Sequence, residues 1–372
     1  MSKDNKIIII NAYQHADTVT GTDRMAYNFL RELQVIDRIN KYHVVCSNEH
    51  YTRSVIKNDN FHILKPPIVK NKLIQRLSNK FWRTLLPLGL IRYRADVYFS
   101  VHNMRLPKLR IARKMIASNL DLIPLKLDEY AQILGKSRKK IYKEMLSVCK
   151  LADYFVSISG FSKQELCKAF SVADSKVLVI PLAVDNNFLK SNMPKSKSVY
   201  PSAKFILTIG GSEPRKNVKE VVEAYRLLPM VIRSEYTLAI AGGDWHGRSL
   251  GEFKANENIK ALGQISDTDL LILYKTATLF VFASKYEGFG FTILEAMAQG
   301  TPVLSSSSSS LPEVGGTAVE YFDNSKVLVN KLQRILTDKK ILGLMSVASK
   351  KRAGDFSWSS SAKKLHTLFI SD

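Results

Sequence analysis

Two carboxylates, Glu287 and Glu295, stand eight residues apart and flank the short sequence Gly-Phe-Gly-Phe. The residues at 279–283 form an apolar run typical of a buried strand, and those at 291–298 have the apolar periodicity of a helix. Glu295 would then lie about one turn inside the helix, with Glu287 in the loop before it. Both side chains can therefore face one crevice.

The glycines of this loop, Gly288 and Gly290, suit a ligand that carries phosphate. A glycine-containing turn before a helix leaves backbone N–H groups at the positive end of the helix dipole, where anions bind. Carboxylates accept hydrogen bonds from hydroxyls instead. The combination indicates a ligand with phosphates and several hydroxyls, as in a nucleotide-sugar. The alternative is that the glutamates are solvated and the glycines only shape a turn.

A second glycine-containing loop follows the strand-like run at 205–209 and reads Gly-Gly-Ser-Glu-Pro-Arg-Lys-Asn from position 210. A helical pattern at 218–228 comes next. Gly211 permits close backbone approach, while Arg215 and Lys216 offer a bidentate fork and a point charge to a diphosphate. By itself, an Arg-Lys pair at a helix start is usually solvated.

The composition is that of a soluble globular protein of about two domains, with 372 residues, 45% of them hydrophobic and 24% charged. Three scattered cysteines, Cys46, Cys149 and Cys167, indicate a reducing compartment. The apolar run at 7–10 is too short for a signal peptide, and no uncharged run approaches the roughly 18 residues that span a bilayer. We therefore expect a cytoplasmic protein.

The net charge of +22 indicates an anionic partner. The stretch at 65–94 is basic and apolar together, and Leu73, Leu77, Phe81 and Leu85 form one stripe if it is helical. Such a stripe suits docking on an anionic membrane surface, although an ordinary core-facing helix has the same spacing.

Alternating strand and helix patterns predict doubly wound parallel sheets. In the first half we expect a strand at 6–12, a helix at 23–36 capped by Thr22 or Asp23, and a strand at 114–117. Ser162 is the expected cap of a later helix. The serine run at 305–310 is expected to be a connecting loop, and Glu313 to be structural.

Four sequences together, Glu-Gly-Phe-Gly-Phe, Leu-Glu-Ala-Met-Ala, Gly-Thr-Pro-Val and Leu-Pro-Glu-Val-Gly, resemble the signature of retaining glycosyltransferases of family 4, also called glycosyl transferases group 1. The resemblance implies the GT-B fold, an α/β architecture of two Rossmann-like doubly wound parallel-sheet domains facing across a cleft. We predict an N-terminal acceptor and membrane-side domain at 1–185, completed by a helix at 356–372, and a nucleotide-sugar donor domain at 186–355.

The resemblance also implies the roles of the site residues. Glu287, Arg215 and Lys216 are the predicted catalytic residues, Glu287 by orienting hydroxyls of the donor sugar and the two cations by neutralising the departing diphosphate. Glu295 would hold the ribose diol, and the base would lie near 263–265. The predicted donor-binding residues are Gly21, Gly211, Arg215, Lys216, Gly288, Phe289, Gly290, Phe291 and Glu295. Gly21 would approach the diphosphate from a turn at 20–24. We expect neither a metal nor another cofactor.

The Glu-Pro-Arg-Lys-Asn wording resembles mannosyltransferase members, so GDP-mannose is the first choice of donor and UDP-sugars stay open. The expected acceptor is a lipid-linked or membrane-held saccharide in surface polysaccharide synthesis at the inner face of the cell membrane. One departure stands out: Leu120 occupies the place of a family histidine. This difference leaves open the alternative that the chain is a non-catalytic subunit, which binds nucleotide-sugar and supports a partner enzyme. A basic nucleic-acid-binding protein is the remaining rival, but no reader motif supports it.

Overall fold

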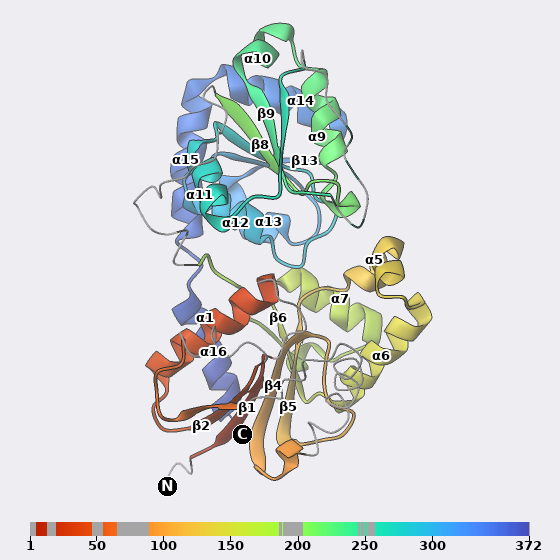
Figure 1. Ribbon diagram of the computed structural model, residues 1–372, viewed down its shortest axis with the longest axis vertical. Helices are drawn as coiled ribbons and strands as arrows, with labels where there is room; N and C mark the ends of the chain where they lie inside the picture. Colours follow the sequence, from red (N-terminus) through yellow and green to blue (C-terminus); the bar gives the residue numbers. More distant parts are fainter. Residues whose placement is uncertain are drawn as a thin grey trace, which may run out of the picture. The chain divides into compact units, whose positions relative to one another are not determined.

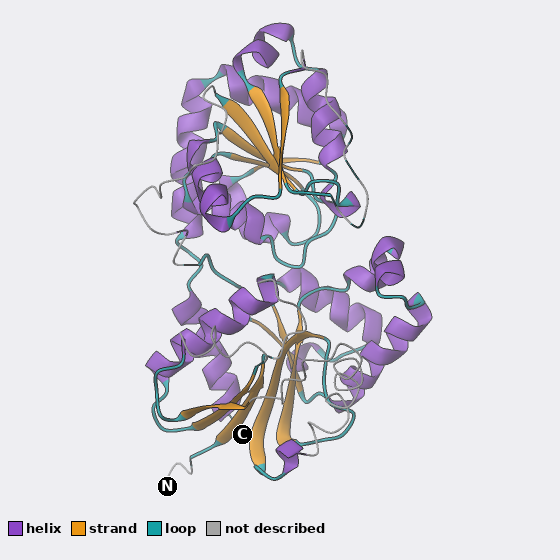
Figure 2. Cartoon of the chain, viewed as in Figure 1, coloured by secondary structure: helices purple, strands orange, loops and turns teal. Residues whose placement is uncertain are grey.

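The computed structural model describes residues 5–12, 20–46, 55–64, 89–185, 204–244 and 257–371, with the single positions 188, 246, 249 and 251. The chain divides into two compact units. Unit 1 comprises Met1–Leu182 and Trp358–Asp372, and unit 2 comprises Ala183–Ser357. Each unit contains a parallel sheet with helices on both faces (Figures 1 and 2). Most of the stretch at 65–94, on which the predicted membrane stripe falls, lies outside the described residues.

The described part of unit 1 has a seven-stranded sheet in the order β3-β2-β1-β4-β5-β6-β7. Its paired strands run parallel. Most residues of β1, β4 and β5 are buried, as expected for parallel strands covered on both faces. The strands are β1 (Ile7–Asn11), β2 (Lys41–Val45), β3 (Phe61–Leu64), β4 (Ala95–Asn103), β5 (Ala112–Asn119), β6 (Tyr154–Ser157) and β7 (Val177–Val179).

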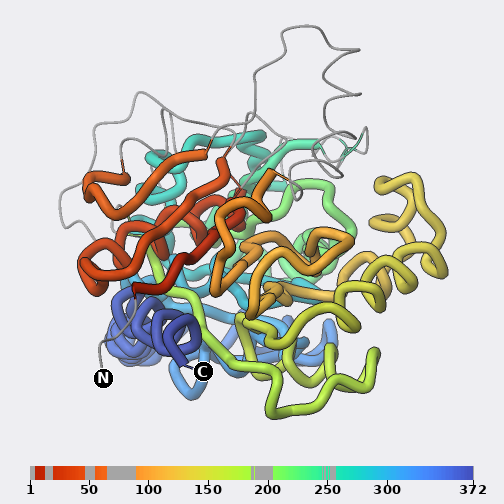
Figure 3. The backbone as a smooth tube through the Cα atoms, turned by 90° about the horizontal axis from the view of Figure 1, so that it is seen from below, coloured from red at the N-terminus to blue at the C-terminus, as the bar shows by residue number. Residues whose placement is uncertain are grey.

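The helices of unit 1 come from both ends of the chain. They are α1 (Gly21–Ile36), α4 (Ile123–Lys126), α5 (Asp128–Ile133), α6 (Arg138–Leu151), α7 (Gly160–Phe170) and the C-terminal α16 (Trp358–Ile370). Helix α16 lies beside α1 (Figure 3). The ring of Trp358 meets that of Phe29 edge-on, with 5.5 Å between the ring centres. His366 of α16 lies 2.8 Å from the carboxylate of Asp37, just beyond α1. The last helix of the sequence thus completes the first unit.

The described part of unit 2 has a six-stranded parallel sheet in the order β10-β9-β8-β11-β12-β13. Its strands are β8 (Phe205–Ile209), β9 (Thr237–Ala241), β10 (Ile259–Gly263), β11 (Leu279–Phe282), β12 (Val303–Ser306) and β13 (Glu320–Phe322). Its helices are α9 (Val218–Arg226), α10 (Met230–Glu235), α11 (Asp267–Thr276), α12 (Phe291–Ala298), α13 (Leu311–Gly315), α14 (Ser325–Thr337) and α15 (Lys339–Ala353), with a 3-10 turn at Pro214–Lys216. The strand order reverses between β8 and β11, and ligands of open parallel sheets bind in the crevice at such a point.

Several details of the sequence prediction are wrong. Thr20, rather than Thr22 or Asp23, caps α1: the Asp23 carboxylate accepts hydrogen bonds from the backbone N–H and hydroxyl of Thr20, at 2.6 and 2.7 Å. Gly21 is accordingly the first residue of α1 and not part of a turn before it. Ser159 caps α7, because its hydroxyl accepts from the N–H of Ser162 at 3.0 Å.

Two strands also extend beyond their predicted bounds. β5 continues through Asn119, and the serine run is only partly a loop because Ser305 and Ser306 are the last residues of β12.

Candidate functional site

The loops after β8 and β9 touch backbone to backbone at the carboxyl edge of the unit 2 sheet. Gly211 has a φ of 51°, and a Cβ atom there would lie 2.1 Å from the carbonyl oxygen of Gly243. A Cβ atom at Gly210 would lie 2.3 Å from Cβ of Lys216. Only glycines allow this packing, which directs the chain into the turn that carries Arg215 and Lys216.

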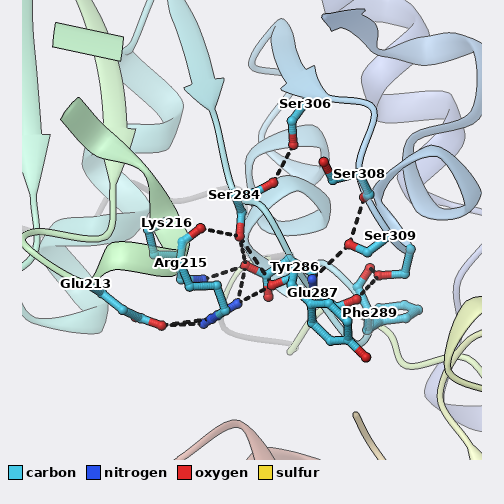
Figure 4. A network of polar contacts seen from close by, with 11 residues as sticks. Glu213, Arg215, Lys216, Ser284, Tyr286, Glu287, Phe289, Ser306, Ser308 and Ser309 are labelled. Carbon is cyan, nitrogen blue, oxygen red and sulfur yellow. Dashed lines mark hydrogen bonds and ion pairs between the residues drawn. The ribbon is translucent and has the colours of Figure 1, made fainter. Parts of the chain in front are cut away.

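Arg215 and Lys216 meet Glu287 across the switch point between β8 and β11 (Figure 4). Nη1 of Arg215 lies 2.6 Å from Oε1 of Glu287, and Nζ of Lys216 lies 2.8 Å from the same oxygen. Arg215 also contacts Glu213 at 2.8 Å and donates to the carbonyl of Tyr286 at 2.7 Å. The three predicted catalytic residues are therefore brought together, although Glu287 lies about 70 positions after the two cations in the sequence.

The charges of this cluster are largely shielded from solvent. The side chains of Arg215, Lys216 and Glu287 are 10%, 13% and 13% exposed. Burial alone would raise the pKa of Glu287, but Lys216 and Arg215 outweigh that effect and lower the pKa to about 2. Glu287 is therefore ionised at neutral pH and forms an ion pair with each of the two cations.

Main-chain contacts join the two loops as well. The N–H of Lys285 donates to the carbonyl of Arg215 at 2.8 Å. The ammonium of Lys216 lies 4.9 Å from the centre of the Phe282 ring, a cation–π contact with the last residue of β11. The position of both cations is thus fixed by the strand that leads to Glu287.

Glu295, the second carboxylate of the motif, is in a different environment. It lies in α12 and is only 6% exposed, and the hydroxyl of Tyr274 lies 3.3 Å from its Oε2. The prediction that Glu287 and Glu295 lie in a loop and a following helix is confirmed. Tyr274, on α11, was not singled out from the sequence because its approach to Glu295 depends on how α11 and α12 pack.

The loop between the two carboxylates leads directly into α12. Gly290 caps this helix with a φ of 117°, a conformation that favours glycine, and Phe291 is its first residue. Phe289 is buried, with its ring 5.6 Å from that of Phe291 and 5.8 Å from that of Phe356. The role of the loop amides in binding phosphate stays a prediction.

Four serines that were not predicted from the sequence hold Glu287, three of them directly and one through Ser284. Ser284 donates to Oε1 of Glu287 at 2.7 Å, and Ser306 donates to the carbonyl of Ser284 at 2.5 Å. Ser309 accepts a hydrogen bond from the N–H of Glu287 (Figure 4). Ser310 contacts the carbonyl of Glu287. The sequence did contain a signal for these contacts. The serine run lies at the carboxyl end of β12, at the same edge of the sheet as the loop after β11 that carries Glu287.

In unit 1, Leu120, which occupies the place of a family histidine, directly follows β5. The N–H of Leu120 donates to Oδ1 of Asn103, and its carbonyl accepts from the hydroxyl of Ser162, both at 2.9 Å. Asn119 is buried and donates to Ser157 and to the carbonyl of Ser162. Gly21 lies at the start of α1, after β1. Its contact with a ligand stays a prediction.

The described residues contain no group of three His, Cys, Asp or Glu side chains that could hold a metal ion. Within the same ranges, no helix has the length and apolar content needed to cross a membrane.

Comparison with known proteins gives a consistent picture of the fold. Sucrose-phosphate synthase from Thermosynechococcus elongatus superposes with a TM-score of 0.72 at 17% identity, over 98% of both chains. WaaG, a glycosyltransferase involved in lipopolysaccharide biosynthesis, superposes with a TM-score of 0.68 at 15% identity, over 98% of this chain and 100% of that one. The predicted fold class, GT-B with two Rossmann-like parallel-sheet domains, is confirmed.

Sequence comparison identifies relatives of higher identity. O-antigen chain mannosyltransferase B of Escherichia coli is 32% identical over 59% of this chain and 60% of its own length. Residues 190–352 match the family model described as "Glycosyl transferases group 1". The chain thus spans less than two thirds of that relative, and its family match covers most of unit 2. This match makes residues 190–352 similar to the glycosyl transferases group 1 family.

Proposed function

We propose that the chain is a retaining glycosyltransferase that transfers a sugar from a nucleotide-sugar to a saccharide acceptor during synthesis of a surface polysaccharide. The observation that carries the proposal is the convergence of Arg215 and Lys216 on Glu287 at the β8–β11 switch point. The relative named as an O-antigen chain mannosyltransferase supports mannose as the transferred sugar and GDP-mannose as the first donor to test. UDP-sugars are the alternative donors.

In this mechanism the two cations act on the leaving group. As the bond between sugar and diphosphate breaks, negative charge grows on the diphosphate, and preorganised cations in a shielded site lower the energy of that state. Arg215 offers a planar fork and Lys216 a point charge. Both are held in place before the donor arrives by Glu287, Glu213 and the carbonyl of Tyr286.

The carboxylates would bind the hydroxyl-bearing parts of the donor. Two cations and the hydroxyl of Ser284 converge on Oε1 of Glu287, so Oε2 is the oxygen proposed to accept a hydrogen bond from the donor sugar. Glu295 would accept from the ribose diol. Its low exposure requires that the ribose approach it closely, beside Tyr274.

The acceptor is proposed to be a lipid-linked saccharide at the inner face of the cell membrane. The net charge of +22 supports attraction to an anionic lipid surface. The end of β5 in unit 1 is ordered by hydrogen bonds among amides and hydroxyls around Leu120, and we propose that the acceptor binds beside this ordered edge. Attachment at this surface would be peripheral.

A panel of nucleotide-sugars tests the proposal. Purified protein is incubated with each donor and a lipid-linked saccharide, and the anomeric configuration of the product is read by NMR. We expect transfer from GDP-mannose with retention at the anomeric carbon. Transfer from no donor, combined with nucleotide binding, would support the non-catalytic subunit instead, above all if Leu120→His restored turnover.

A further inference from the structure

The loop that carries Glu287 is held by serines from a separate segment, after β12. The hydroxyl of Ser309 accepts a hydrogen bond from the N–H of Glu287 at 2.8 Å and donates its own proton to the carbonyl of Ser308 at 2.7 Å. Oγ of Ser310 lies 2.9 Å from the carbonyl oxygen of Glu287 and 2.7 Å from that of Phe289. A hydroxyl has one proton, so Ser310 shares or alternates it between the two carbonyls.

These contacts fix the direction of the loop's peptide groups. In a planar trans peptide, a carbonyl and the N–H of the next residue point in opposite directions. The carbonyls of Glu287 and Phe289 both face Ser310, and the described chain has no cis peptide. The N–H groups of Gly288 and Gly290 therefore point away from Ser310, as needed for an anion bound before α12.

Both serines occupy positions that are unfavourable for this residue type, one because of its backbone conformation and the other because of its burial. Ser309 has a φ of 55°, in the left-handed region where glycine is least strained. Ser310 is fully buried. A buried hydroxyl is tolerated when it is hydrogen-bonded, and here its partners are the carbonyls of the candidate site.

Main-chain and side-chain contacts thus converge on one residue. Ser309 and Ser310 hold the backbone of Glu287, while Ser284, itself contacted by Ser306, holds its carboxylate. We propose that Ser309 and Ser310 are positioning residues: they orient Glu287 toward Arg215 and Lys216 and turn the amides of Gly288 and Gly290 toward the donor diphosphate. This inference rests on the proposed function, because it assigns the serines to the same donor site.

The test uses Ser309→Gly, because glycine removes the hydroxyl and also removes the cost of the left-handed backbone. We expect its melting temperature to stay within about 3 °C of the wild type. Amide exchange at Glu287 should become about tenfold faster or more, because its hydrogen-bond acceptor is lost. Turnover should fall about 10- to 100-fold, with a smaller change in KM for the donor, because the loop is misplaced rather than removed.

Two further variants serve as comparison. Ser310→Ala should show the same loss of turnover. Ser307→Ala changes an exposed serine of the same run and should behave as the wild type. Wild-type turnover in Ser309→Gly, or unchanged exchange at Glu287, would overturn the inference.

The experiment also separates this inference from the proposed function. If the wild-type protein transfers sugar from no donor, the proposed function fails and the serines are judged by binding alone. The readout is then the rise in melting temperature that GDP or UDP produces. A clearly smaller rise in Ser309→Gly than in Ser307→Ala would support the positioning role, and an equal rise would overturn it.

Discussion

The carboxyl ends of the two parallel sheets differ in the kind of polar group they present. In unit 2, Arg215 and Lys216 lie 2.6 and 2.8 Å from the carboxylate of Glu287, in a charged and shielded cluster. In unit 1, the main chain of Leu120 after β5 is held by uncharged groups: Asn103 accepts from its N–H, and Ser162 donates to its carbonyl. The carboxylate of Asp121 also lies 3.3 Å from the amide of Asn103. The same topology therefore supports two different chemistries.

The difference follows from what each group can bind. Buried cations interact strongly with a diphosphate, because few waters screen the charges. Amides and hydroxyls can both donate hydrogen bonds to the uncharged hydroxyls of a sugar and accept hydrogen bonds from them. On the proposed function, the charged edge serves the donor and the neutral edge serves the acceptor. Substitutions at the two edges can test this assignment of donor and acceptor, and the one with the largest expected effect comes first.

Replacing Lys216 with alanine should have the largest effect on catalysis. We expect kcat/KM for the nucleotide-sugar to fall about 100- to 1000-fold, because one of two cations facing the leaving group is lost. Steady-state kinetics measure this directly. Lys219→Ala is the matched control, since Lys219 is exposed three positions further along and should keep nearly full activity. Equal losses in both variants would show that only the general positive charge matters.

Glu287→Gln should lower stability in a pH-dependent way. The pKa of Glu287 is about 2 in the folded chain, below the ordinary value of 4.5, so its ionisation stabilises the fold above pH 4.5. This contribution, on the order of 3 kcal/mol, is lost as pH falls from 4.5 toward 2. Urea unfolding of both proteins should show a large difference in unfolding free energy at pH 7 that narrows below pH 4.5.

The control for this prediction is an exposed ion pair in unit 1. Glu144 lies 2.6 Å from Lys136 and is 50% exposed. Glu144→Gln should change the unfolding free energy by less than about 0.5 kcal/mol at any of these pH values. A pH-independent cost for Glu287→Gln would contradict the assigned role of the cations in lowering its pKa.

Asn103→Ala should have the smallest effect of the three and should act on the acceptor. It removes the acceptor of the Leu120 N–H and a contact with the carbonyl of Asp121. We expect KM for the saccharide acceptor to rise about 5- to 10-fold, equivalent to about 1 to 1.5 kcal/mol, with donor KM unchanged within about twofold. A rise in the KM for the donor instead would contradict the assignment of the unit 2 edge to the donor and the unit 1 edge to the acceptor.

Much of the fold was predictable from local pattern. Helix α12 has the predicted bounds, and β8 does as well, because apolar periodicity and flanking glycines define both. The cap of α1 was misassigned by two or three residues and that of α7 by three. The Thr-x-x-Asp spacing at Thr20 is a capping-box pattern, and it would have corrected the first.

The candidate site was predictable in part. The sequence indicated Arg215, Lys216 and Glu287 separately, and the strand order brings them together at the switch point. The serine contacts were not predictable, because they depend on the path of the chain after β12. That path places Ser309 and Ser310 beside a loop more than twenty positions earlier.

The most direct test of the central claim compares GDP with guanosine by isothermal titration calorimetry, in the wild type and in Lys216→Ala. If unit 2 binds the donor through its diphosphate, GDP should bind the wild type at least about 100-fold more tightly than guanosine, a difference of about 3 kcal/mol. Most of that difference should disappear in Lys216→Ala. Equal affinity for the two ligands in the wild type, or an undiminished preference for GDP in the variant, would contradict the claim.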